Sequence, residues 1–86
     1  MTFEYENLNQ AGTVTLKPAA GQLHTITVNT TAAGAITVYD NTAASGKVIA
    51  VLKASVAEQT FLYDLEFHTG LTINLAAASD ITVTYS

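Results

Sequence analysis

The stretch Gln22-Leu23-His24-Thr25-Ile26-Thr27-Val28-Asn29-Thr30 decides the fold class of this chain. Its residues alternate with period two, which places His24, Ile26 and Val28 on one face and Leu23, Thr25, Thr27 and Asn29 on the other. This period is typical of a β-strand with one buried face. β-Branched residues pack well on a pleated surface and strengthen the prediction. We therefore expect residues 22–30 to form a strand with a threonine-rich outer face and His24 at the edge of the core.

Shorter runs with the same alternation lie on both sides of this stretch, separated by turn residues at intervals of about 8–12 residues. Since the connections are short, we expect antiparallel neighbours, with a hairpin turn at 31–34 and a tight turn at Thr69-Gly70. The pattern predicts an all-β fold, a small antiparallel β-sandwich or jelly-roll-like barrel of about seven strands. The predicted strands cover residues 13–17, 22–30, 35–39, 47–53, 60–67, 71–75 and 81–85.

Two of these runs carry further information. Residues 47–53 are apolar on both faces between their lysines, which favours a central strand or one whose second face meets a neighbour; a helix continuing through 54–58 is the competing interpretation. In residues 60–67 the large side chains Phe61, Tyr63, Leu65 and Phe67 share one face. We expect these aromatic residues to form the centre of the core.

Length and charge limit the organisation and the function. With 86 residues and no Cys, the chain predicts one domain over residues 13–86, preceded by an N-terminal arm at 1–12, stabilised by packing alone. The net charge is −4, and the only lysines, Lys17, Lys47 and Lys53, are scattered, so we expect no nucleic-acid partner. No run approaches the roughly 20 apolar residues that span a bilayer, and the acidic N-terminus differs from a secretory signal, so we expect no membrane partner.

No residue pattern in the sequence predicts catalysis. Ser45, His24 and His68 are present, but the G-x-S-x-G turn that presents a nucleophilic serine is absent. We therefore predict a non-enzymatic protein with no catalytic residue, no cofactor and no metal. Asp40-Asn41 is expected to cap its own loop through bonds from backbone amides.

The alternating polar residues Asp64, Glu66 and His68 form the one polar group that a strand would hold on a single face. Three readings remain open for them. They could be a solvated face whose charges discourage wrong edge pairing, a subunit contact, or ligands of a metal ion.

Several segments together form a recognisable pattern: Gly21–His24, Ile36–Thr42 with Ser45-Gly46, Phe61–Asp64, Phe67-x-Thr69-Gly70-Leu71 and Asp80–Tyr85. This pattern resembles small structural proteins of tailed bacteriophages and prophages, and the resemblance runs from about residue 21 to residue 86. Among these proteins, the size of the chain is similar to that of head decoration or cement proteins.

The resemblance implies a capsid decoration protein, a homotrimer on the outer capsid surface of a virion that is made in the host cytoplasm. Its partners would be the major capsid protein or other virion proteins. Phe3, Tyr5 and Leu8 of the arm, together with Asp64, Glu66 and His68, are the expected partner contacts. The alternative is a glycan-binding module of a tail or head fibre, with loops 40–46 and 76–80 as its contact tips.

Overall fold

The computed structural model describes residues 3–86, and this part of the chain consists of strands joined by turns and short loops. It contains no helix of the length and apolar character needed to cross a membrane. The strands are β1 (Glu4–Leu8), β2 (Gly12–Lys17), β3 (Gly21–Thr30), β4 (Ile36–Asp40), β5 (Lys47–Leu52), β6 (Thr60–Phe67), β7 (Leu71–Leu75) and β8 (Asp80–Tyr85).

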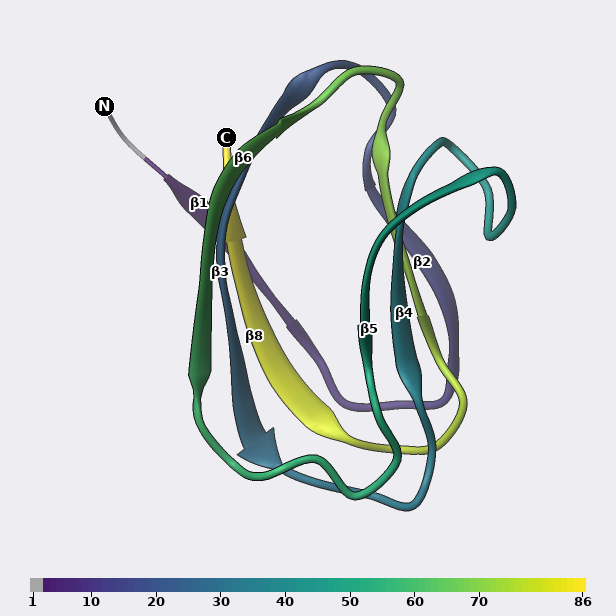
Figure 1. Ribbon diagram of the computed structural model, residues 1–86, viewed down its shortest axis with the longest axis vertical. Helices are drawn as coiled ribbons and strands as arrows, with labels where there is room; N and C mark the ends of the chain where they lie inside the picture. Colours follow the sequence, from purple (N-terminus) through teal and green to yellow (C-terminus); the bar gives the residue numbers. More distant parts are fainter. Residues whose placement is uncertain (1–2) are drawn as a thin grey trace.

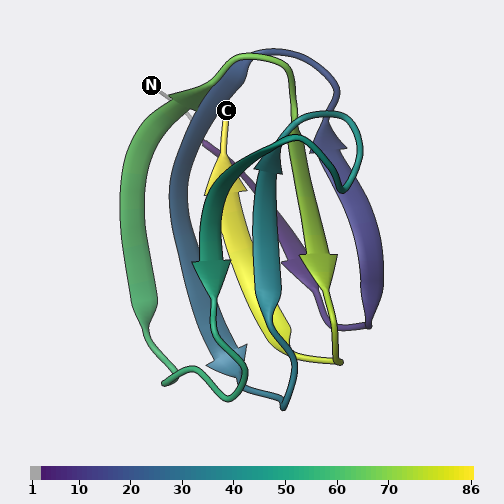
Figure 2. The ribbon, with the colours of Figure 1, turned by 45° about the vertical axis from the view of Figure 1, so that its right-hand side comes forward.

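The eight strands form two antiparallel sheets that pack face to face. Sheet A has the order β1-β8-β3-β6, and sheet B has the order β2-β7-β4-β5 (Figure 1). In Figure 2 both sheets run from β6 and β5 on the left to β1 and β2 on the right. This arrangement is a jelly roll. The predicted all-β sandwich is therefore confirmed, with one strand more than the approximate count of seven.

Most connections cross between the sheets, which corrects the predicted hairpins. Only β4 and β5 are neighbours both in the sequence and in a sheet. The turn at residues 31–34 leads from β3 in sheet A to β4 in sheet B, and Thr69-Gly70 likewise joins β6 to β7 in opposite sheets. Packed sheets lie about 10 Å apart, a distance that a few extended residues span. An alternating apolar pattern fits both arrangements, so it could not distinguish a hairpin from a crossing.

Two strand assignments also differ from the sequence predictions. Residues 4–8, placed by the sequence in an arm, form β1, which pairs with β8. For residues 47–53 the sequence predicted a central strand or one whose second face meets a neighbour. The first alternative is wrong because β5 is the edge of sheet B, and the second stays a prediction. Val48 and Val51 point away from the core there and are 52% and 59% exposed. No residue within 3–86 covers these two apolar side chains.

The core lies between the two sheets and is made mainly by the inward residues of the central strands β3, β4, β7 and β8, with Leu8, Leu52 and Phe67 added by the edge strands β1, β5 and β6. Phe67 is the largest fully buried side chain, whereas Phe61 and Tyr63 are only partly buried because β6 is an edge strand. The prediction that all the aromatic residues of this run form the core centre holds for Phe67 alone. The other side chains with less than 2% exposure are Leu23, Ile26, Ile36, Val38, Leu71, Ile73, Leu75, Ile81, Val83, Thr72 and Ser79.

Candidate interaction surfaces

His24 lies at a paired irregularity in sheet A, and this changes its predicted orientation. Relative to β8, strand β3 carries one extra residue between Leu23 and Thr25, and β6 carries an extra residue opposite the same place. A bulge of this kind shifts the alternation by one residue. Leu23 and Ile26 both point into the core as a result, and His24 is displaced from the face of Ile26 and Val28 where the sequence placed it.

The displaced His24 makes two side-chain contacts. Its Nδ1 atom contacts a carboxylate oxygen of Asp64, and its ring stacks on that of Phe3 with the centroids 4.2 Å apart and the planes 8° from parallel. Asp64 has a φ of 48°, the left-handed conformation, which Asp adopts more readily than most residues. These three residues, which we call the His24 cluster, link the start of β1 to β3 and β6.

The predicted polar group Asp64, Glu66 and His68 is divided between different environments. Asp64 pairs with His24, while the backbone N–H of His68 donates to Asp40. Within residues 3–86 no three His, Asp or Glu side chains lie close enough together to hold a metal ion. Glu66 is exposed on β6 opposite Gln22 of β3. Of the expected partner contacts on this strand, Asp64 and Glu66 therefore remain accessible on the edge of sheet A.

The outer face of sheet A carries a ladder of hydrogen-bonded polar side chains. The Nδ2 groups of Asn7 and Asn29 both donate to Oδ1 of Asp80, at 2.7 and 3.2 Å, and both also donate to Oγ1 of Thr82. Further along, Thr25 bonds Thr84 and Thr27 bonds Thr60. The predicted threonine-rich outer face is confirmed, and its polar groups are satisfied by their neighbours across the strands.

Asp40 anchors the connection between β6 and β7. Its carboxylate accepts hydrogen bonds from the backbone N–H groups of His68 at 2.9 Å, Thr69 at 2.8 Å and Gly70 at 3.4 Å. The bond from Thr69 is the largest of the influences that lower the pKa of this carboxyl group from its ordinary value of 3.8. The sequence predicted that Asp40 would accept bonds from amides of its own loop. The amides it binds instead lie some 30 residues further along the chain, in the connection between β6 and β7.

Asn41 does cap the loop that follows it. Its Nδ2 group donates to the carbonyl oxygen of Ser45 at 2.9 Å, and its Oδ1 accepts from the N–H of Thr42. The hydroxyls of Thr72 and Thr15 bond the carbonyls of Asn41 and Thr42 and hold the loop against sheet B. Ser45 is thus part of a turn, as the sequence indicated.

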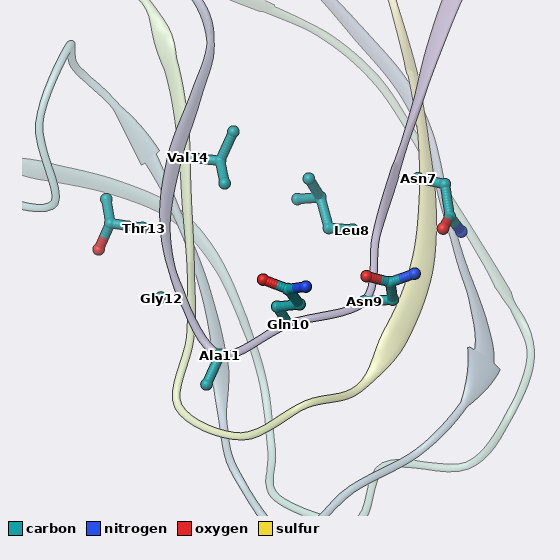
Figure 3. Close-up of a pocket in the computed structure, with 8 residues that line it drawn as sticks. All are labelled: Asn7, Leu8, Asn9, Gln10, Ala11, Gly12, Thr13 and Val14. Carbon is teal, nitrogen blue, oxygen red and sulfur yellow. The ribbon is translucent and has the colours of Figure 1, made fainter.

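The predicted contact residues of the N-terminal segment have three different environments. Tyr5 is 74% exposed, Phe3 stacks on His24, and Leu8 is buried against the core. Where β1 turns into β2, residues 7–14 line a hollow of about 320 Å³. Figure 3 shows Leu8 and Val14 pointing towards each other across this hollow, with Gln10 at its floor.

Among the comparisons with known proteins, only the search of solved structures gives matches. No family model matches the chain, and no curated protein matches it. The solved structure of the core of Drosophila NLP, which is described as giving insight into pentamer formation and histone binding, is similar over 100% of this chain and 98% of that one. The TM-score is 0.66 and the sequence identity is 18%, so the match establishes a shared fold.

This finding overturns the identification made from the sequence. The resemblance to phage structural proteins is wrong, because the Drosophila NLP core matches the chain over its full length and no family or curated match supports a phage protein. The two functions predicted with this resemblance, capsid decoration and glycan binding by a fibre module, are therefore also wrong. The predicted homotrimer, capsid partner and virion location are wrong for the same reason. Short turns such as Val38–Thr42 recur in many β-proteins and misled the sequence reading.

Proposed function

We propose that this domain is a non-enzymatic protein-binding module that assembles into a ring of five copies and binds a basic protein of the histone type. The observation that carries the proposal is the match over the full length of both chains to the NLP core. That protein is described through pentamer formation and histone binding. A shared fold alone permits many functions, so the charge and the exposed apolar residues of this chain are needed as further support.

The charge of the chain suits a basic partner. Seven acidic residues stand against three lysines, which gives a net charge of −4. Glu58, Asp64 and Glu66 are exposed around β6, and the chain has no arginine among its basic residues. Carboxylates on an exposed edge attract a basic protein and raise the rate of encounter. The same balance opposes binding to the phosphate backbone of nucleic acid.

The exposed apolar side chains suit self-assembly. A single small sandwich buries a modest core, and association adds to its stability. Val48, Val51 and Leu62 lie exposed on the edge strands β5 and β6, and Tyr5 and Val14 lie exposed on β1 and β2. Large apolar side chains on open edges favour contact with another copy.

The proposal is tested on the purified chain. Native mass spectrometry and sedimentation velocity measure the number of copies, and we expect five. Titration with purified histones should give saturable binding that weakens steeply with added salt, because the contacts are between exposed charges. Glu66→Lys should weaken histone binding without changing the number of copies. A monomer at all concentrations would refute the ring, and absence of histone binding at low salt would refute the partner.

A further inference from the structure

We propose that copies of this chain join head to tail, with the β5 edge of one copy against the side of the next copy that carries β1, β2 and the hollow between them. The inference rests on the proposed ring and identifies the surfaces that would hold it together. In this arrangement a second copy of the same chain covers the exposed valines of β5.

The two surfaces lie on opposite sides of the sandwich. β5 ends sheet B on one side, whereas β1 ends sheet A and β2 ends sheet B on the other (Figure 2). A contact between two different surfaces repeats from copy to copy, and it closes into a ring when the rotation between copies fits. Because the two surfaces are separate, one copy can contact a different neighbour on each side, which every ring requires.

The apolar content of the two surfaces is complementary. β5 presents Val48 and Val51 on the outer face of sheet B. The opposite side presents Val14, which is 36% exposed, beside the hollow that it lines with Leu8 (Figure 3). Burying exposed valines in such a recess removes apolar surface from water on both partners.

The charges decide which pairing is favourable. Lys47 and Lys53 flank the exposed valines of β5, and β5 itself carries no acidic residue. On the opposite side, β1 carries Glu4 and Glu6 and no basic residue, and both glutamates are exposed. The one lysine of that side, Lys17 at the end of β2, has its Nζ close to Gly21 of β3. Glu4 and Glu6 pair with Tyr85 and Val83 of β8, whose side chains face the core, so the two glutamates lie on the inner side of the β1 edge.

This distribution selects a head-to-tail contact over a symmetric one. Two β5 edges in contact would bring lysines against lysines, and two β1 edges would bring glutamates against glutamates. Like charges in contact suppress a pairing, while opposite charges fix it. Pairing β5 with β1 engages two lysines and two glutamates, so the surface outside the contact keeps the net charge of −4 that suits a basic partner.

The experiment reverses the charges on each surface separately. One variant carries Glu4→Lys with Glu6→Lys, and a second carries Lys47→Glu with Lys53→Glu; sedimentation velocity and native mass spectrometry report the assembly. Each variant alone should lose the ring, with the association constant for one contact falling about tenfold or more. The four changes combined in one chain should restore it. Far-UV circular dichroism checks that every variant is folded.

Mixing the two variants gives a sharper result. In the mixture each copy meets favourable charges only on a copy of the other kind, so assemblies should form that contain equal numbers of both. Such assemblies cannot close with five copies. Glu66→Lys is the matched control, because it makes the same charge change as Glu6→Lys at an exposed position on β6.

The outcomes separate the inference from the proposed function. A wild-type ring that is unaffected by either double variant would overturn the head-to-tail contact while leaving the ring intact. A single Glu6→Lys variant is measured beside Glu66→Lys. Loss of the ring to the same extent in both would also overturn the contact, because net charge or β6 would then be responsible. A wild-type chain that is a monomer at all concentrations would refute the proposed function itself.

Discussion

Replacing Asp40 with Asn should destabilise the domain by an amount that the structure allows us to work out. The carboxylate accepts hydrogen bonds from the N–H groups of His68, Thr69 and Gly70. Asn keeps one acceptor oxygen, but it loses the charge and turns an NH₂ group towards amides that also donate. Hydrogen bonds to a charged group contribute about 1.5–3 kcal/mol. Since Asp40 is half-exposed, we take the lower end, about 1.5 kcal/mol.

The pH dependence provides a second, independent signature of the same contact. The hydrogen bonds lower the pKa of Asp40 in the folded protein, so the unfolded chain binds the proton more tightly. The stability that the carboxylate supplies is therefore present above its unfolded pKa and is lost as the pH falls through its folded pKa. The difference in stability between the wild type and Asp40→Asn should thus be full at neutral pH and vanish in strong acid.

The assay is thermal and urea unfolding followed by circular dichroism at equal protein concentrations, since association would otherwise shift the midpoints. At neutral pH the melting temperature should fall by about 6–12 °C for a domain of this size. Glu66→Gln is the control, because it removes an exposed carboxylate for which no hydrogen bond is found within residues 3–86, and it should change stability by less than about 0.5 kcal/mol. An Asp40→Asn protein as stable as the wild type, or a difference that persists in strong acid, would refute the reasoning.

Three further predictions concern Gly34, the tyrosines Tyr63 and Tyr85, and the glutamates beside Tyr85. Gly34→Ala should destabilise the domain by about 1–3 kcal/mol, because the added Cβ would lie 2.5 Å from the backbone nitrogen of Ala77. Ala33→Val, at the exposed neighbouring position, is the control and should change stability little. Equal melting temperatures for the two variants would contradict this prediction. Burial raises the pKa of Tyr63 and of Tyr85, so stability should fall as the pH rises above about 10, where the unfolded phenols ionise first. Glu4→Gln with Glu6→Gln should lower the pKa of Tyr85 in an NMR titration and leave Tyr63 unchanged; an unchanged Tyr85 would show that the glutamates do not act on it.

The alternation of apolar residues was sufficient to predict most of the strands. It located β7 and β8 with the correct faces, since Leu71, Ile73 and Leu75 and then Ile81, Val83 and Tyr85 all point inward. It failed at His24 because a bulge adds one residue without any mark in the local pattern. It also misplaced β5, since an exposed edge that is apolar on both faces reads like a buried central strand.

The candidate surfaces were harder to predict because their residues meet only in the folded chain. Asp40 accepts bonds from amides that lie about 30 residues further along the chain, and Asp64 of β6 contacts His24 of the neighbouring strand β3. Their partners depend on which strands cross between the sheets, and turn composition did not determine that. The exposed positions of Tyr5 and Glu66 follow from edge strands, which a sequence pattern alone does not distinguish from central ones.

The pairing of β1 with β8 has a consequence for how the chain is made. The first strand has no neighbour in its sheet other than the last one, so sheet A stays open until residues 80–85 have left the ribosome. Until then β3 lacks one of its two partners, and its apolar face is available to chaperones or to other nascent chains. Folding then requires closure of a loop that spans nearly the whole described chain, which predicts slow acquisition of the native state, in milliseconds to seconds, after synthesis.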